Sequence, residues 1–101
     1  MLKYTLYWDD IEESERNEDL VKEKLGSIDK YLVDVKTELK SLEVLMSTGA
    51  RWGYKVKLNL KIPGRNFFAQ AKDRGLVLAL VESRDRVITQ VKDYLEKLKD
   101  H

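Results

Sequence analysis

The chain has 101 residues, of which 43% are hydrophobic and 37% are charged. This length supports one domain with a single core, and the composition is that of a soluble globular protein. The absence of cysteine excludes disulfides and thiolate zinc sites. No apolar run approaches the roughly 18 residues that a membrane span needs, and the start lacks the pattern of a secretory signal. We therefore expect a cytoplasmic protein.

The net charge of +1 conceals an uneven distribution along the chain. Residues 1–19 hold seven acidic and two basic side chains, whereas residues 20–101 hold 17 basic and 11 acidic ones. Most of the chain is thus basic, which suits an anionic partner such as RNA, because neutralised phosphates release counterions. Charges that alternate on ordinary solvated faces are the other interpretation.

The first two predicted elements are a strand and a helix. Apolar residues at every second position of residues 2–8 predict a half-buried strand. A helix is predicted from about Glu15 to Leu32, with Ser14 as a possible N-cap and acidic residues in its first turn. Gly26 weakens this helix slightly. Its apolar stripe comprises Val21, Leu25, Ile28 and Leu32.

Two further strands are predicted in the middle of the chain. Residues 42–46 alternate in a short strand, and Ser47 to Trp52 read as a turn or loop that contains Gly49. From Tyr54 to Ile62, apolar residues alternate with three lysines and an asparagine. This period of two predicts a strand with one face in the core and lysines along the other face.

A turn, a fourth strand and a long helix complete the pattern. Pro63 presets φ at the second position of a tight turn and Gly64 accepts a positive φ at the third. A strand is predicted over residues 66–72, and the period becomes helical from about Leu76 to Leu98. The apolar stripe of this helix comprises Val77, Leu80, Val81, Val87, Ile88, Val91, Leu95 and Leu98.

The order β-α-β-β-β-α predicts an α+β fold with a four-stranded sheet and two helices packed on one face, which is the natural two-layer solution. The covered face would include Leu58, Leu60, Phe67 and Ala69. The open face would carry five positive charges and one negative charge. It would comprise Lys3, Thr5, Tyr7, Glu43, Lys55, Lys57, Asn59, Lys61, Phe68, Gln70 and Lys72. Lysines among aromatic rings could hold phosphates while a base stacks, although ordinary solvated faces have the same composition.

Several motifs occur together in a characteristic order. The segment KLNLKIPGRNFFAQA, residues 57–71, combines an alternating strand, a Pro-Gly-Arg turn and a strand that ends in Ala-Gln-Ala, and a long helix follows. The first helix adds a second pattern, at Val21, Lys24, Leu25, Ile28, Lys30, Tyr31 and Leu32. In this order the motifs resemble the ribosome hibernation-promoting factors, also called ribosome-associated inhibitors.

The resemblance implies a βαβββα domain over residues 1–101, similar in architecture to double-stranded RNA-binding domains. It also implies a translation inhibitor that binds ribosomal RNA of the small subunit near the mRNA and tRNA sites, and idles the ribosome in stress or stationary phase. No cofactor, membrane or small-molecule substrate is expected, and the protein would be a monomer off the ribosome. Because longer members continue into a dimerising domain where this chain stops, at His101, we expect a short form.

The basic residues predicted to contact RNA lie in the first helix, in the central strands with their turn, and in the last helix. They are Lys24, Lys30, Lys55, Lys57, Lys61, Arg65, Lys72, Arg86, Lys92 and Lys97. The last helix interleaves its basic residues with acidic ones and lacks the basic stripe of the family. A protein-interaction or adaptor module that kept the fold but lost ribosome binding is therefore the alternative. We expect the acidic segment 9–19 to lie at one end of the domain, away from the binding surface.

Two features of the sequence remain, the position of Arg84 and the lack of catalytic or metal-binding motifs. Arg84 falls within the apolar stripe of the last helix, so it should pair with a carboxylate or lie where the stripe leaves the sheet. A contact with RNA or with a partner and a snorkelling stem are the two interpretations. The only histidine is His101, and no nucleophile motif, phosphate loop or EF-hand spacing is present. We predict no enzyme, no catalytic residue and no metal site.

Overall fold

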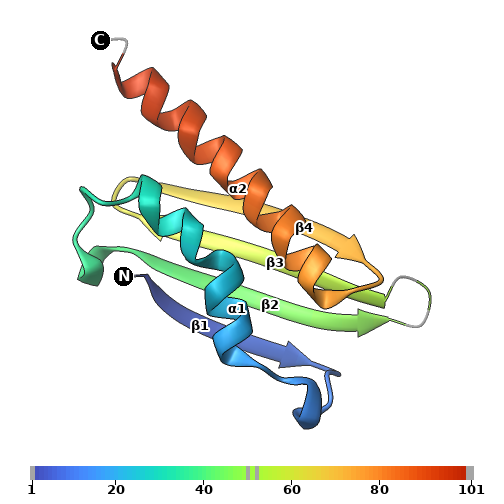
Figure 1. The fold of residues 1–101 in the computed structure, drawn as a ribbon. Helices are drawn as coiled ribbons and strands as arrows, with labels where there is room; N and C mark the ends of the chain where they lie inside the picture. The colour runs from blue at the N-terminus through green and yellow to red at the C-terminus, as the bar shows by residue number, and fades with distance from the viewer. Residues whose placement is uncertain (1, 50, 52, 100–101) are drawn as a thin grey trace.

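The computed structural model describes residues 2–49, 51 and 53–99, and it shows two helices packed on one face of a four-stranded sheet (Figure 1). The strands are β1 (Lys3–Asp9), β2 (Ser41–Gly49), β3 (Gly53–Ile62) and β4 (Arg65–Asp73). The helices are α1 (Glu18–Leu25) and α2 (Leu76–Lys99), with short 3-10 segments η1 (Glu13–Glu15), η2 (Gly26–Tyr31) and η3 (Thr37–Leu39). The predicted α+β fold, its βαβββα order and its two layers are confirmed.

The sheet is mixed and its strands lie in the order β1-β2-β3-β4. β1 and β2 are parallel and are connected through α1, as a parallel pair requires a crossover, while β2–β3 and β3–β4 are antiparallel hairpins. In the β3–β4 turn Gly64 has a φ of 82°, as the Pro-Gly sequence predicts. Gly53, at the start of β3, has a φ of 79°, and a Cβ there would lie 2.8 Å from the Cα of Arg74. Glycine is therefore required at both positions.

The core lies between the sheet and the helices. All four residues of the first predicted helical stripe are buried, as are alternate residues of β2 and β3. The buried residues of α2 are Ala79, Leu80, Ser83, Val87 and Val91. Val77 and Leu98 were predicted on this stripe, but 38% and 53% of their surfaces are exposed. Small residues occupy the contact at the start of α2 instead, and the end of α2 extends beyond the sheet (Figure 1).

The first helix differs from the prediction at both ends. Ser14 and Glu15 belong to η1, and the N-cap of α1 is Asn17, whose side-chain oxygen accepts a hydrogen bond from the backbone N–H of Leu20 at 3.0 Å. Asn is as good an N-cap as Ser, so the acidic residues before it gave a misleading start. The α-helix ends at Leu25, and the chain continues as η2 from Gly26, a residue of low helix propensity.

The predicted loop over residues 47–52 is shorter than expected. Ser47 and Thr48 extend β2, because they pair with Lys55 and Tyr54 of β3. Positions 50 and 52 of this loop, like His101, lie outside the described residues. Over the described part of the chain, no helix is both long and apolar enough to cross a membrane.

Candidate nucleic-acid interface

The strand register places the side chains of the open sheet face in rows that cross the sheet. Lys55 lies opposite Ser47 of β2 and Lys72 of β4, and in the next row Lys57 lies opposite Leu45 and Gln70. Three lysines from two neighbouring strands are thereby brought together at one end of the face. We call Lys55, Lys57 and Lys72 the lysine cluster.

Mutual repulsion within the lysine cluster is evident at its central member. The positive charge of Lys57 lowers the pKa of Lys55, with smaller contributions from partial desolvation and from Lys72. Among the described residues, no carboxylate forms an ion pair with Lys55 or Lys57. An anion bound here would relieve the repulsion, so this end of the face is electrostatically suited to a phosphate.

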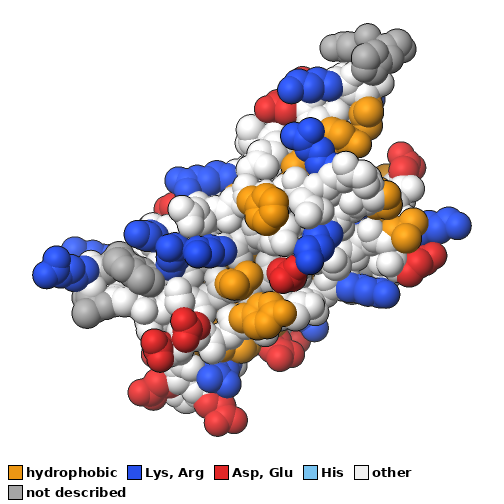
Figure 2. Space-filling view, turned by 180° about the vertical axis from the view of Figure 1, so that it is seen from behind, with side chains coloured by type: hydrophobic (Ala, Val, Ile, Leu, Met, Phe, Trp, Pro, Cys, Tyr) orange, Lys and Arg blue, Asp and Glu red, His pale blue; other side chains and the backbone are white. Residues whose placement is uncertain are grey.

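Apolar side chains lie beside the lysine cluster on the same face. Tyr7, Leu45 and Phe68 are 48%, 40% and 63% exposed. Figure 2 shows hydrophobic side chains along the middle of this face and a group of Lys and Arg side chains to the left of them, with others at the right and the top. A shallow hollow of about 280 Å³ adjoins Phe68 and is also lined by Lys57 and Gln70. Leu45 was missing from the predicted open face, although its alternation with Val44 and Met46 in the sequence would have placed it there.

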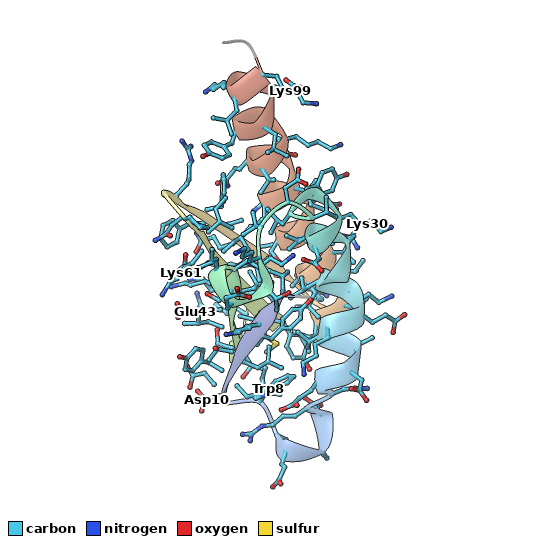
Figure 3. The ribbon with its side chains drawn as sticks, turned by 90° about the vertical axis from the view of Figure 1, so that its left-hand side faces the viewer. Trp8, Asp10, Lys30, Glu43, Lys61 and Lys99 are labelled. Atoms are coloured by element: carbon cyan, nitrogen blue, oxygen red, sulfur yellow. The ribbon has the colours of Figure 1, made fainter. Side chains whose placement is uncertain are left out.

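Lys61 lies on the same face but is engaged in an ion pair. Its Nζ is 2.5 Å from Oε1 of Glu43, which also accepts a hydrogen bond from Nδ2 of Asn59 at 3.4 Å. Figure 3 shows Lys61 and Glu43 on one side of the sheet, with Lys30 on the opposite, helical side. Lys61 is therefore less available to an anionic ligand than Lys55 and Lys57 are.

The other predicted contact residues lie in the helical layer or point toward it. The guanidinium of Arg65 lies 5.4 Å from the ring of Phe67 and 5.2 Å from that of Tyr94. The Nζ of Lys92 lies 5.4 Å from the ring of Tyr31. Lys24, Lys30 and Lys97 belong to α1, η2 and α2. The structure thus divides the ten candidates into four on the open face, of which three form the lysine cluster, and six on the helical side.

Arg86, one of these six, holds the outer edge of β4. Nη1 of Arg86 donates a hydrogen bond to the carbonyl of Gln70, and Nε2 of Gln90 donates to the carbonyl of Phe68 at 2.6 Å. These bonds satisfy carbonyl groups that an edge strand would otherwise expose. The guanidinium of Arg86 therefore has a structural partner.

Two further cations link the helices to their surroundings. Arg84 pairs with Asp85 at 2.9 Å, as expected for an arginine in an apolar stripe, and its Nη1 donates to the carbonyl of Lys24 at 3.2 Å. Lys40 is only 4% exposed; its Nζ lies 2.6 Å from Asp29 and donates to the carbonyl of Leu32 at 3.1 Å. Sequence reasoning missed Lys40, because a lysine just before a strand carries no signal of burial.

The acidic segment lies on both sides of the sheet. Asp9 is on the open face and, through Ser47, in the same row as Lys55. Glu15 lies on the helical side, where its carboxylate accepts a hydrogen bond from the Tyr54 hydroxyl at 3.2 Å and raises the pKa of Tyr54. The expectation that the whole segment lies away from the open face is wrong for Asp9, because β1 continues to that residue.

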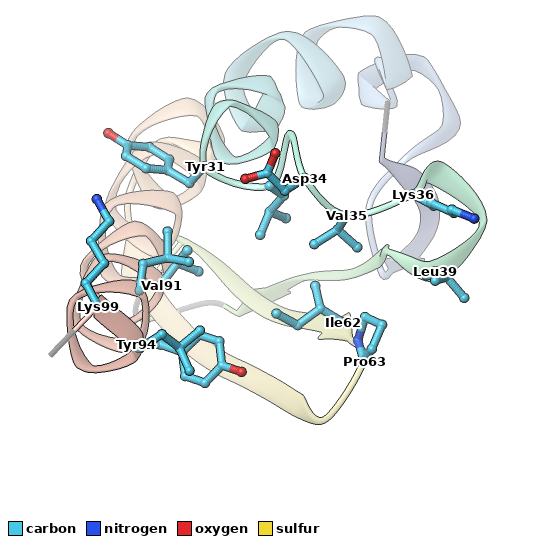
Figure 4. Close-up of a pocket in the computed structure, with 13 residues that line it drawn as sticks. Tyr31, Asp34, Val35, Lys36, Leu39, Ile62, Pro63, Val91, Tyr94 and Lys99 are labelled. Atoms are coloured by element: carbon cyan, nitrogen blue, oxygen red, sulfur yellow. The ribbon is translucent and has the colours of Figure 1, made fainter. Parts of the chain in front are cut away.

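A larger hollow of about 720 Å³ lies between the end of α2, the loop after η2 and the β3–β4 turn (Figure 4). Its walls are mostly apolar, and Tyr31, Val35, Ile62 and Tyr94 are among them. Within the described ranges, the structure brings together no group of three or more histidine or acidic side chains that could hold a metal ion.

Comparisons with known proteins give one family and several similar structures. Residues 4–99 match the family described as sigma 54 modulation protein / S30EA ribosomal protein. The structure is similar to the N-terminal domain of Protein Y from Thermus thermophilus, with 26% identity, a TM-score of 0.78, and coverage of 93% of this chain and 99% of that chain. It also shares its fold with a ribosomal subunit interface protein from Coxiella burnetii, with 15% identity, a TM-score of 0.73, and coverage of 94% and 99%. The search of curated proteins found no match.

Proposed function

Since the chain belongs to the family of sigma 54 modulation and S30EA ribosomal proteins, we propose that it inhibits translation by binding ribosomal RNA of the small subunit near the mRNA and tRNA sites. This is a family of ribosome-associated proteins and not of enzymes, in agreement with the predicted class. The inhibitor would act in the cytoplasm under stress, as a monomer off the ribosome and without a cofactor. This function agrees with the resemblance found in the sequence.

The lysine cluster is the observation that carries this proposal. Lys55 and Lys57 come from one strand and repel each other, and no carboxylate in the described part of the chain pairs with them. Ribosomal RNA supplies closely spaced phosphates, whose neutralisation releases counterions. A phosphate bound at the open face would therefore both pair with these lysines and relieve the repulsion between them.

Sedimentation of ribosomes with the purified protein over a range of salt concentrations tests this proposal. We expect the wild-type chain to travel with small subunits and to dissociate steeply as salt rises. Replacing Lys55, Lys57 and Lys72 by alanine together should flatten the salt slope by about one unit per lost phosphate contact. The matched control replaces Lys22, Lys36 and Lys99, which removes the same charge from exposed residues that are not among the predicted RNA contacts. Equal slopes for the wild type and the open-face variant would remove this surface as the binding site.

An adaptor function remains the second candidate, and the apolar hollow beside the end of α2 favours it. Leu98 is 53% exposed at this hollow, and α2 has no continuous basic stripe. An adaptor would bind a protein in place of RNA, and its binding would depend little on the lysine cluster. Failure of the wild-type chain to sediment with ribosomes at low salt would favour this alternative.

A further inference from the structure

We propose that the open sheet face holds an unpaired RNA nucleotide, with its base stacked on the ring of Phe68 and its phosphates at Lys57 and Lys55. This inference rests on the proposed function and makes it specific: at this contact the RNA would be single-stranded. The occupant follows from the combination on one face of an exposed ring, a hollow beside it and an adjoining cluster of positive charge.

The ring of Phe68 is placed for binding and not for packing. Its neighbour Phe67 is 1% exposed and lies in the core, whereas Phe68 is 63% exposed, the most exposed aromatic side chain in the described residues. The backbone beneath the ring is held on both sides. Phe68 pairs with Asn59 of β3, and its carbonyl accepts the hydrogen bond from Gln90. A ring presented from a fixed backbone loses little freedom when a base stacks on it.

The positive charges lie at a suitable distance from the ring. Lys57 lies opposite Gln70, which is two residues from Phe68 along β4. Lys57 and Phe68 are therefore diagonal neighbours about 7–8 Å apart. Lys55 is on the same face about 7 Å farther along β3. The hollow of about 280 Å³ lies between the ring and the lysine side, with Gln70 in its wall. A nucleotide seated here would place its base and its phosphates over complementary groups.

The exposed ring distinguishes single-stranded RNA from a duplex. Bases of a duplex are stacked on each other and paired, so a protein ring can stack only on a base that is free of its partner. Four-stranded sheets with exposed aromatic rings bind unpaired bases in this way. In the described part of the chain both helices lie on the other side of the sheet (Figure 1), which leaves room on the open face for such a contact.

The test compares the binding of two fluorescent RNAs, an eight-nucleotide single strand and a blunt two-stranded duplex of eight base pairs, by fluorescence anisotropy at fixed salt. We expect the single strand to bind the wild-type chain more tightly. Phe68→Ala and Phe68→Leu should both weaken binding of the single strand about 5-fold or more, since loss of base stacking typically costs about 1–3 kcal/mol. Phe68→Tyr should keep the affinity, because it keeps the ring. Leu78→Ala, at a residue of α2 that is 57% exposed, is the control and should change nothing.

Sedimentation of the same variants with ribosomes separates this inference from the proposed function. Suppose that the wild-type chain binds ribosomes, and that Phe68→Ala binds both ribosomes and the single strand with wild-type affinity. The stacking site is then overturned, and the proposed function stands. Wild-type affinity of Phe68→Leu for the single strand would also overturn the stacking site, because an apolar contact without a ring would then suffice. Loss of ribosome binding by Phe68→Ala, with no binding of the single strand by the wild type, would indicate a protein contact and overturn it. Tighter binding of the duplex than of the single strand would also overturn the stacking site.

Discussion

Both sides of the sheet carry basic residues, but the two sides use them differently. On the helical side, Arg84 pairs with Asp85, Arg86 donates to the edge of β4, and Arg65 lies over two aromatic rings. On the open side, Lys55 and Lys57 lie beside each other with no carboxylate partner in the described residues. Lys61 marks the boundary, since it shares this face and yet pairs with Glu43.

This difference shows that the number of basic residues on a surface does not measure its capacity to bind an anion. A cation with a good partner must give up that partner to reach a phosphate, and the lost interaction opposes binding. Where two cations repel each other, anion binding is favoured by two terms, the attraction to the ligand and the relief of the repulsion. The mixed charges of α2, which seemed to weaken the case for RNA, therefore bear less on the proposed binding than Lys55 and Lys57 do.

The largest expected contrast is between adjacent residues on opposite faces. Phe67→Ala should lower the free energy of unfolding by about 3–5 kcal/mol, because it leaves a cavity in the core under Tyr94. Phe68→Ala should change it by less than about 0.5 kcal/mol, since Phe68 lies on the surface. Urea denaturation followed by circular dichroism measures both. Comparable losses would mean that the open face is part of the folded core and not a free surface.

The next contrast concerns buried and exposed lysines. Lys40→Met should cost about 3 kcal/mol, the low end for a broken buried ion pair, because its partner Asp29 is 28% exposed. Lys36→Met, in the same loop and exposed, is the matched control and should have little effect. Both values come from urea titrations at pH 7. A stability of Lys40→Met equal to that of the control would show that this pair contributes nothing net to folding.

A smaller effect is expected at the outer edge of β4. Gln90→Ala should lower the free energy of unfolding by about 1 kcal/mol, because the carbonyl of Phe68 loses its hydrogen bond from Nε2. Thr89→Ala is a control at the preceding position of α2, where the hydroxyl donates a hydrogen bond to the carbonyl of Asp85 in the same helix. Amide exchange of β4 reports the local effect. Unchanged exchange in β4 would argue that water replaces the side chain without loss.

Much of the fold was predictable because period-two and helical patterns were strong. The alternation in residues 54–62 identified β3 and both of its faces, and the turn at Pro63 and Gly64 fixed the β3–β4 hairpin. The helix boundary at Asn17 was missed, because two acceptable caps and a run of acidic residues lie close together in the sequence. Such choices depend on which side chains the tertiary structure brings near, and local preference does not decide them.

The candidate site was predictable in its members but not in its grouping. Lys55, Lys57 and Lys72 follow from alternation, whereas their proximity depends on the register of β3 with β4. The ion pair of Lys61 with Glu43 joins residues 18 positions apart in the sequence, so no local sequence pattern indicates it. The partners of Arg65 and Arg86 likewise come from other elements. Sequence thus indicates which residues are basic and exposed, and only the packing shows which of them already have partners.

The smallest expected effect tests how far the acidic segment influences the open face. Asp9 lies two strands from Lys55 in the same row, about 10 Å away, which is slightly beyond the screening length of about 8 Å at physiological salt. Asp9→Asn should therefore raise RNA affinity about twofold at 20 mM salt and hardly at all at 150 mM. Glu38→Gln makes the same change of charge beyond the far end of β2, about 20 Å from this row, and should have no effect at either salt. Anisotropy titrations with the single-stranded RNA measure both variants. An equal gain from the two variants would mean that only the net charge matters, whereas a large gain from Asp9→Asn at 150 mM would extend the binding surface to the end of β1.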